Sequence, residues 1–233
     1  MKVVILAGGF GTRIGAQAAP CPKPMLEIGG RPMLWHLMQL YAAFGYTEFI
    51  ICAGYKQEAI RSWVASGGAA PWQVNVVDTG LETMTGGRIK RVAELLEGES
   101  FFLTYGDGLC SLNLNSELEF HRAHGKLATV CAVRPEPRFG ALQLEGERVA
   151  AFREKDERDV GWINGGFMIF EPQVLSYIAQ DSTVLEREPL ERLAAEGELM
   201  AYRHYGFWQC MDTLRDKEKL EALWSDGKAP WIR

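Results

Sequence analysis

Three glycines and two cations near the start of the chain have the spacing of a phosphate-binding loop. Gly8, Gly9 and Gly11 directly follow an apolar run at positions 3–7. Glycine carries no Cβ and can adopt positive φ values, so successive backbone N–H groups can point at the oxygens of one anion. Arg13 adds a forked donor, and Lys23, between two prolines, adds a compact cation. The stretch therefore predicts a buried strand that leads into a phosphate site.

Two better-known glycine motifs do not fit this stretch. A dinucleotide fingerprint that starts at Gly9 needs a third small residue at position 14, where Ile14 stands. A Walker loop needs Lys and Ser or Thr directly after its last glycine, and Lys23 lies too far downstream. The glycines alone could also serve only to form a tight turn. Arg13 and Lys23 favour the phosphate site over that alternative.

Several polar residues further along the chain could bind a ligand or could be purely structural. Asp107 stands between glycines after the apolar run 101–105 and can bind a hard cation, but Asp-Gly is also a common turn pair. Asp212 could be the N-cap of the last helix. Lys155 could be a solvated surface charge, and Asn164, which precedes two glycines, could lie in a β-bulge.

Composition limits the class of protein. The formal charge of −5 over 233 residues argues against a nucleic-acid-binding groove, which needs an excess of Lys and Arg. No apolar stretch approaches the roughly 18 residues of a membrane span, and no charged segment with a cleavage site precedes the first strand. The five cysteines form no C-x-x-C pair, as expected for reduced thiols. We therefore expect a cytoplasmic protein that binds neither membranes nor nucleic acids.

The elements that must position these residues alternate between strand and helix in the first half of the chain. Strands are expected at 3–7, 48–53, 73–77, 101–105 and 127–133, and helices at 32–41, 56–64 and 88–96, with a capping box of Ser116 and Glu119 before a further helix. This alternation predicts an α/β fold with a doubly wound, mostly parallel sheet, in a single domain that covers residues 1–233. The carboxyl ends of its strands would bring residues 8–13, 78–80 and 106–108 together.

The second half of the chain has a different pattern. Shorter β-like segments at 141–144, 149–153 and 165–170 predict a small antiparallel β extension. Helices are expected at 181–197 and 213–224, with a strand at 199–205 between them. His121 and His124 share a helix face without a third ligand, so we interpret them as surface or packing residues.

The motif from Leu6 to Arg13, followed by Pro22-Lys23-Pro24-Met25, resembles the signature of the sugar-1-phosphate nucleotidyltransferases, also called nucleotide-sugar pyrophosphorylases. Further blocks are similar to the glucose-1-phosphate cytidylyltransferase branch of this superfamily: 84–88, 104–108, 138–142, 164–167, 197–201, 212–217 and 227–231. The resemblance thus covers nearly the whole chain. It implies a Rossmann-like nucleotidyltransferase fold.

The resemblance also implies roles for individual residues. Nucleotide binding would fall to Leu6, Ala7, Gly8, Gly9, Gly11, Thr12, Arg13, Lys23, Thr85, Gly86, Arg88 and Gly106, with Arg13 and Lys23 catalytic. The sugar phosphate would be held by Tyr105, Gly140, Glu154, Lys155 and Asn164, and the cofactor Mg²⁺ by Asp107 and Asp212.

The implied reaction joins CTP and a sugar 1-phosphate, most simply α-D-glucose 1-phosphate, to give a CDP-sugar and pyrophosphate. UTP, dTTP or another phosphorylated acceptor are alternatives within the same chemistry. A catalytically silent nucleotide-sugar-binding subunit is a further alternative, and a Rossmann oxidoreductase is disfavoured by Ile14. The resemblance leaves room for a homo-oligomer.

The chain departs from the family pattern at a few positions. The segment between Trp63 and Trp72 is shorter than the long insertion of the cytidylyltransferase branch, which leaves subunit packing open. Cys210 stands where the family usually has proline, and Asp156 follows Lys155 where proline is also usual. Pro22 replaces a second lysine that is common in the family, which removes one auxiliary cation.

Overall fold

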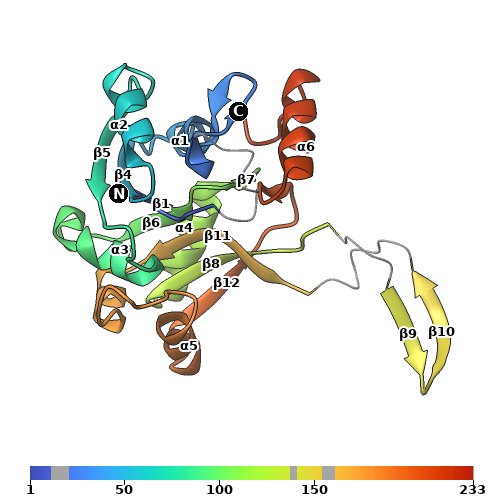
Figure 1. Cartoon of the computed structure of the whole chain (residues 1–233). Coiled ribbons are helices and arrows are strands. Elements are labelled where there is room, and N and C mark those ends of the chain that lie inside the picture. The colour runs from blue at the N-terminus through green and yellow to red at the C-terminus, as the bar shows by residue number, and fades with distance from the viewer. Residues whose placement is uncertain (12–20, 137–140, 154–160, 233) are drawn as a thin grey trace.

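The computed structural model describes residues 1–11, 21–136, 141–153 and 161–232 and is built on a seven-stranded sheet (Figure 1). Its strand order is β12-β8-β11-β6-β1-β4-β5. The strands are β1 (Val3–Ala7), β4 (Glu48–Ala53), β5 (Gln73–Asp78), β6 (Phe101–Tyr105), β8 (Ala128–Val133), β11 (Ile163–Phe170) and β12 (Leu199–Arg203). Thr12, Arg13, Gly140, Glu154 and Lys155 lie outside the described residues.

Most strand pairs in the sheet are parallel. β1 pairs in parallel with β4 and β6, β4 with β5, and β8 with β12, whereas β11 is antiparallel to both β6 and β8. The predicted α/β class and mostly parallel sheet are confirmed. The expected strand at 165–170 is placed differently, because it lies inside the main sheet as β11 rather than in a separate extension.

Helices cover both faces of the sheet, and each face has its own hydrophobic core. Alternate residues of β1 point to opposite faces, with Val3 and Ile5 in one core and Val4 and Leu6 in the other. The first core includes α1 (Met33–Ala42), α2 (Gln57–Ala65), α4 (Leu114–His124) and α6 (Leu214–Ser225). The second includes α3 (Thr85–Arg91), α5 (Glu188–Ala195) and the 3₁₀ helices η3 (Ala93–Leu96) and η5 (Pro172–Tyr177). This two-sided packing is the doubly wound arrangement.

Three helix boundaries differ from the sequence-based expectation. α3 begins at Thr85 rather than at residue 88, because the glycines at 86 and 87 are helical, and it ends at Arg91, with residues 93–96 forming the separate η3. α4 is capped by Asn113, whose side chain accepts a hydrogen bond from the backbone N–H of Ser116, so the predicted capping box of Ser116 and Glu119 is wrong. α5 begins only at Glu188, since residues 181–187 form turns that pack against α3.

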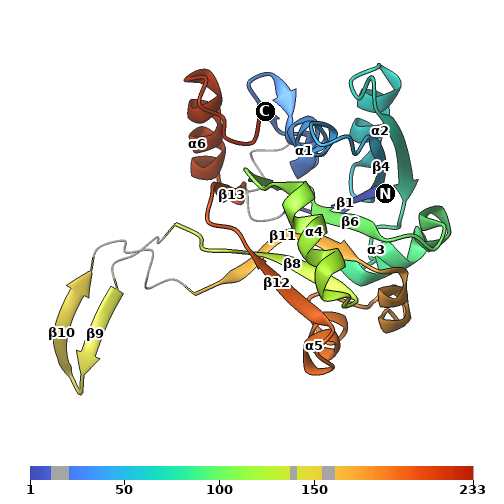
Figure 2. The ribbon, with the colours of Figure 1, turned by 180° about the vertical axis from the view of Figure 1, so that it is seen from behind.

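Short antiparallel pairs complete the fold. β2 (Glu27–Ile28) pairs with β3 (Arg31–Pro32), and β7 (Gly108–Cys110) with β13 (Trp208–Cys210). β9 (Ala141–Glu145) and β10 (Arg148–Arg153) form the predicted antiparallel extension, which Figures 1 and 2 both show outside the main sheet. The β7–β13 pair matters most for function, because it brings the segment before α6 next to the end of β6.

Trp231 packs the C-terminal segment against His36 of α1. Trp231 is fully buried, and its indole Nε1–H donates to Nδ1 of His36 at 3.1 Å. Nε2 of His36 in turn donates to the carbonyl of Ile28 at 2.9 Å. None of the helices in the described part of the chain has both the length and the apolar character needed to cross a lipid bilayer.

Candidate active site

A cavity of about 780 Å³ opens at the carboxyl ends of β1 and β6, where the strand order predicts a ligand site. Its volume lies within the range usual for small-molecule sites. It is lined by residues 6–11, 23–24, 81–85, 88, 104–108, 164–167, 186, 208, 210 and 212. The cavity therefore joins segments from both ends of the chain.

The three glycines after β1 are needed for different reasons. A Cβ on Gly8 would lie 2.1 Å from a guanidinium nitrogen of Arg88, so only glycine fits beside that side chain. A Cβ added to Gly9 would have no described heavy atom within 4 Å apart from its chain neighbours, so the space beside this backbone is open to a ligand. Gly11 has a φ of 65°, in the left-handed region that favours glycine. Together they keep the start of the loop accessible.

The side chain of Arg88 donates hydrogen bonds to residues at the ends of β1, β4 and β5. Its guanidinium donates to the carbonyls of Gly8 at 3.1 Å and Gly80 at 2.8 Å, and to the hydroxyl of Thr79 at 2.7 Å. It also reaches the carbonyl of Ala53 at 3.2 Å. The side chain is only 5% exposed, and burial lowers its pKa. Arg88 thus fixes the backbone that faces the cavity.

Glu186, which the sequence analysis did not identify, connects two residues of the cavity wall. Oε2 of Glu186 accepts from the hydroxyl of Thr85 at 2.6 Å, and Oε1 accepts from the hydroxyl of Tyr105. Burial and this carboxylate raise the pKa of Tyr105. Thr85 also accepts from the backbone N–H of Leu185 at 2.9 Å, and the N–H of Gly86 donates to the carbonyl of Thr183 at 3.0 Å. Glu186 therefore links a predicted nucleotide residue to a predicted sugar residue.

The Asn164 segment forms the opposite wall. Its pairing with β8 shifts register between Asn164 and Met168, which is the bulge that the two glycines allow. Oδ1 of Asn164 accepts from the N–H of Gly166 at 2.8 Å. Trp208 Nε1–H donates to the carbonyl of Gly165 at 2.7 Å and so attaches β13 to this wall.

Lys23 and two aspartates form the charged centre of the site. Nζ of Lys23 lies 2.6 Å from Oδ2 of Asp107 and 2.6 Å from Oδ1 of Asp212. The Lys23 side chain is 11% exposed, and those of the aspartates are 30% and 25% exposed. Burial lowers the pKa of Lys23, but the two carboxylates outweigh it and the pKa is raised overall. The lysine is therefore held as a cation.

Asp107 and Asp212 do not take the structural roles that the sequence left open for them. The carboxylate of Asp107 contacts Lys23 across the site, and its backbone carbonyl accepts from the N–H of Met211 at 2.8 Å. The N-cap of α6 is Thr213, in a reciprocal capping box with Asp216, so Asp212 is not the cap. Both aspartates thus point toward the cavity.

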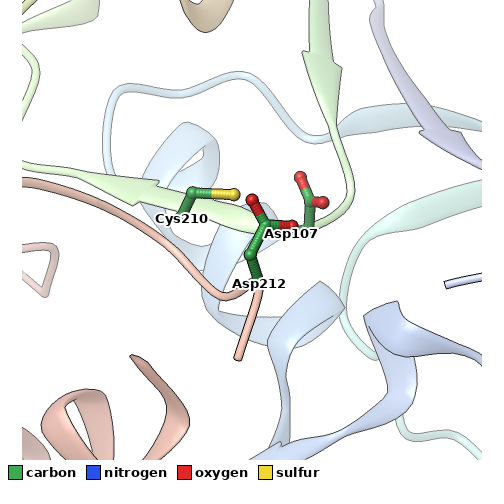
Figure 3. A group of neighbouring side chains, drawn as sticks. All are labelled: Asp107, Cys210 and Asp212. Carbon is green, nitrogen blue, oxygen red and sulfur yellow. The ribbon is translucent and has the colours of Figure 1, made fainter. Parts of the chain in front are cut away.

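Cys210 completes a group of three side chains that can hold a metal ion. The ligand atoms of Asp107, Cys210 and Asp212 all lie within 4.8 Å of one another, and Figure 3 shows them pointing toward a common region. Burial and the charge of Asp107 raise the pKa of the Cys210 thiol. Two carboxylates are suitable ligands for a hard divalent cation.

The cavity brings together most of the predicted site residues that the structure describes. Leu6 to Gly9, Gly11, Lys23, Thr85, Arg88, Tyr105 to Asp107, Asn164 and Asp212 all line it, whereas Gly86, within α3, packs against Thr183 instead. Glu186 and Cys210 were missed as site residues. Nothing in the sequence distinguished Glu186 from an ordinary acidic residue of the predicted helix at 181–197. For Cys210, the only signal was that the family usually has proline at this position.

The glycine loop, the half-buried Lys23 and the paired carboxylates line one cavity at the end of the parallel strands. Residues 2–226 match the family model described as nucleotidyl transferase. A glucose-1-phosphate cytidylyltransferase from Salmonella typhi is 48% identical, with 99% of this chain and 98% of the relative covered. A probable glucose-1-phosphate cytidylyltransferase from Bacillus subtilis is 38% identical, with 99% of each covered. The chain belongs to the nucleotidyl transferase family, as the sequence motifs predicted.

Solved structures agree with this assignment. HddC from Yersinia pseudotuberculosis, in a structure complexed with GMP-PN, superposes with a TM-score of 0.79 at 26% identity, covering 96% of this chain and 99% of that one. A UDP-glucose pyrophosphorylase complexed with UDP-glucose shares the fold with a TM-score of 0.75 at 15% identity, covering 97% and 98%. The predicted nucleotidyltransferase fold is confirmed.

Proposed function

We propose that this protein is a sugar-1-phosphate cytidylyltransferase that joins CTP to α-D-glucose 1-phosphate and releases pyrophosphate. The relatives named glucose-1-phosphate cytidylyltransferase, similar over nearly their whole length, support the choice of substrates. The observation that carries the chemistry is the contact of Lys23 with two carboxylates at the mouth of the glycine loop. In the proposed reaction an oxygen of the sugar phosphate attacks the α-phosphorus of CTP, and no covalent enzyme intermediate forms.

Catalysis in this proposal consists of alignment and charge neutralisation, because two anions must approach each other. The loop from Gly8 to Gly11 would hold the nucleotide phosphates, and Lys23 would stabilise the charge that develops as pyrophosphate leaves. Arg13 would assist Lys23 in this role, as the resemblance implies. Tyr105 and Asn164 would hold the sugar phosphate on the other side of the cavity. The resemblance assigns Gly140, Glu154 and Lys155 to the same ligand. No nucleophile-and-base pair is required.

The cofactor in this proposal is Mg²⁺, held by Asp107 and Asp212. The fit rests on the two oxygen ligands and on the cation, Lys23, that they already bind. Bound there, Mg²⁺ would supply positive charge to the reacting phosphates. Lys23 would then turn from the carboxylates to the pyrophosphate oxygens.

Base choice would depend on backbone groups that Arg88 holds in place. Cytosine offers an amino donor at C4 and an acceptor at N3, so a matching site presents an acceptor and a donor at those positions. Arg88 fixes the carbonyls of Gly8 and Gly80, with Thr85 and the N-terminal end of α3 nearby. A mismatched base would leave a buried group unpaired, at about 1–3 kcal/mol, or roughly one to two decades in discrimination.

The remaining assignments are proposals of the same kind. The chain would act as one domain in the cytoplasm, with CTP and the sugar 1-phosphate as its substrates. The chain would also be able to form a homo-oligomer, as the resemblance allows.

The direct test is pyrophosphate release over a grid of nucleoside triphosphates (CTP, UTP, dTTP, GTP) and hexose 1-phosphates. We expect CTP with glucose 1-phosphate to give the highest kcat/KM, by at least about tenfold over UTP or dTTP. Equal use of UTP or dTTP would overturn the cytidine assignment but leave the nucleotidyltransferase standing. Release with none of the pairs would favour the silent binding subunit.

Metal dependence is tested separately through the carboxylates. Asp107→Asn and Asp212→Asn should each lower kcat by about two orders of magnitude or more, because a metal at the reacting phosphates is worth several kcal/mol. Asp226→Asn, which changes an exposed aspartate paired with Lys228, is the matched control and should retain activity. Circular dichroism checks that each variant is folded. Full turnover in the presence of a chelator would exclude the metal.

A further inference from the structure

Glu186 joins two hydroxyl groups that different elements bring to the cavity. Thr85 is the first residue of α3, Tyr105 is the last residue of β6, and Glu186 lies in the segment before α5. All three line the cavity. Oε2 of Glu186 accepts from the hydroxyl of Thr85 at 2.6 Å, and Oε1 accepts from the hydroxyl of Tyr105. One carboxylate is therefore shared between two hydroxyl groups.

These contacts fix the hydrogen-bonding role that each hydroxyl can take toward a ligand. A carboxylate without a proton only accepts, whereas a hydroxyl has one proton and two lone pairs. The protons of Thr85 and Tyr105 are therefore used within the protein, on Glu186. Toward a bound molecule, each of the two hydroxyl oxygens can act only as an acceptor.

Neighbouring groups hold both hydroxyls in place. Thr85 accepts from the backbone N–H of Leu185 at 2.9 Å, which leaves its oxygen one lone pair. The ring of Tyr105 packs against Gly166, where a Cβ would lie 2.5 Å from Cδ2 of the ring. Burial and Glu186 raise the pKa of Tyr105, so its hydroxyl keeps the proton that it donates. The two acceptors are thus arranged before a substrate binds.

Fixed acceptors of this kind discriminate between ligand groups. A hydroxyl or an amino group of a ligand can donate to them. A carbonyl oxygen or a fluorine at the same place has no proton to donate, so the oxygen of the protein would stay unpaired. Loss of one neutral hydrogen bond of this kind weakens binding by roughly fivefold to tenfold.

We propose that Glu186 is a specificity-determining positioning residue, because it commits Thr85 and Tyr105 as acceptors for donor groups of the two substrates. At Tyr105 the donor is a hydroxyl of the sugar, and at Thr85 it is a ribose hydroxyl or the amino group of the base. The inference rests on the proposed function for which substrate lies on which side, and it deepens that function by assigning the direction of the hydrogen bonds. Glu186 acts through the two hydroxyls and not on the reacting atoms.

Binding of a nucleotide sugar by the full chain tests the carboxylate. Calorimetry uses the one among CDP-, UDP-, dTDP- and GDP-glucose that wild type binds most tightly. Glu186→Gln keeps the shape but presents an amide NH₂, so one hydroxyl must turn its proton toward the ligand. We expect the Kd to rise at least about fivefold. An unchanged Kd in Glu186→Gln overturns the inference, whereas a preference of wild type for another base overturns only the cytidine assignment.

Glu188→Gln is the matched control for this measurement. Glu188 is an exposed acid close by in the sequence, and it pairs with Arg192 on the surface of α5. Its replacement should change the Kd less than about twofold, since exposed ion pairs contribute little. A Kd that rises equally in Glu188→Gln and Glu186→Gln would reflect the loss of surface charge and would overturn the inference.

Double-mutant cycles distinguish action through the hydroxyls from simple support of the cavity wall. Glu186→Gln is repeated in Tyr105→Phe, in Thr85→Val and in the variant that carries both changes. Its effect on the Kd should shrink in at least one single background and fall below about twofold when both hydroxyls are absent. An effect that keeps its full size there overturns the inference. Circular dichroism and urea unfolding check that each variant is folded.

Substrate analogues identify the donor groups. Glucose 1-phosphate analogues in which fluorine replaces one hydroxyl at a time should include one that loses at least about fivefold in kcat/KM with wild type but not with Tyr105→Phe. 2′-Deoxy-CTP, 3′-deoxy-CTP and UTP test the ribose hydroxyls and the amino group in the same way against Thr85→Val. If every analogue keeps its full penalty in the matching variant, neither hydroxyl accepts from a substrate and the inference is overturned.

Discussion

Glu117 is a buried acid that takes no part in the proposed chemistry. It lies in α4, fully buried, and neither carboxylate oxygen has a hydrogen-bond partner among the described residues. Burial raises its pKa to about 8 from the ordinary 4.5. The folded protein therefore holds Glu117 protonated at neutral pH, while the unfolded chain releases that proton. Stability contributed by the neutral form is complete below about pH 4.5 and is lost as the pH rises to about 8.

Glu117→Met should stabilise the protein and flatten this pH dependence. Methionine has a similar length and no polar atom, so the cost of a buried carboxylate disappears. We expect a gain in the free energy of unfolding of about 1–3 kcal/mol at pH 8 and a smaller gain at pH 5, where the neutral carboxyl is still buried without a hydrogen-bond partner among the described residues. Urea unfolding followed by circular dichroism at pH 5, 6.5 and 8 measures it.

Glu119→Gln, an exposed change on the same helix, is the control and should leave the free energy of unfolding nearly unchanged. A gain in Glu117→Met that is equal at pH 5 and pH 8 would show that ionisation is not the cause.

The position of α3 depends on Gly86 and Gly87, two residues with low helix propensity. A Cβ on Gly87 would lie 2.3 Å from the carbonyl oxygen of Asp181 and 2.6 Å from its Cα. A Cβ on Gly86 would lie 2.8 Å from the carbonyl of Thr183. The two glycines let α3 approach the 181–187 segment, which carries Glu186 into the cavity. Close packing here sets the geometry of the cavity wall.

Gly87→Ala should destabilise the protein although alanine is the better helix former. Helix propensity favours alanine by about 1 kcal/mol, but the clash is with backbone atoms that cannot rotate away. We expect a net loss of about 1–3 kcal/mol by urea unfolding, and a raised KM for CTP as Thr85 and Glu186 shift.

Gly161→Ala is the control, since no described heavy atom lies within 4 Å of its built Cβ. A Gly87→Ala protein that is more stable than wild type would mean that α3 is not held against residues 181–187.

Elements with strong local signals were predicted well from the sequence. The strands at 3–7, 48–53 and 101–105 have the predicted bounds, because each is a buried apolar run with clear ends. The fold class followed from their alternation with helices. The expected helix at 181–197 is shorter, since its first seven residues, 181–187, form turns that pack against the glycines of α3, a contact with no local signature.

The sequence predicted those residues of the candidate site that belong to recognisable local motifs. Lys23, Asp107 and Asp212 stood out, and the structure brings them together although 189 positions separate the first from the last. Glu186 and Cys210 were missed because their importance depends on which residues face them across the cavity. Arg88 was expected near the base, and the structure adds that it holds the carbonyls of the loop.

At the scale of the whole molecule, the C-terminal segment packs into the hydrophobic core on the α1 side of the sheet. The ring of Trp231 is fully buried between His36 and Phe207, with centroid distances of 5.9 and 5.6 Å. Its indole N–H satisfies the one nitrogen of His36 that does not donate to Ile28. The segment after α6 is therefore part of the core that supports α1.

Trp231→Ala should lower the free energy of unfolding by about 3–5 kcal/mol, as large aromatic truncations in cores do. Trp231→Phe keeps most of the apolar contact but leaves Nδ1 of His36 without a donor, so a smaller loss of about 1–3 kcal/mol is expected. Urea unfolding measures both. Trp162→Ala, at a half-buried site, should cost less than Trp231→Ala, and a reversed order would contradict the role given to the C-terminal segment.

The strand order has a consequence for how the protein is made. β1 lies between β4 and β6, so the first strand to leave the ribosome stays unpaired on one edge until residue 105 has been synthesised. Lys23 gains its second carboxylate partner later still, because Asp212 is translated 189 residues after it. A prematurely terminated chain would carry the glycine loop without the second carboxylate and without Trp231. Such fragments would therefore lack both a complete charged centre and part of the core that supports α1.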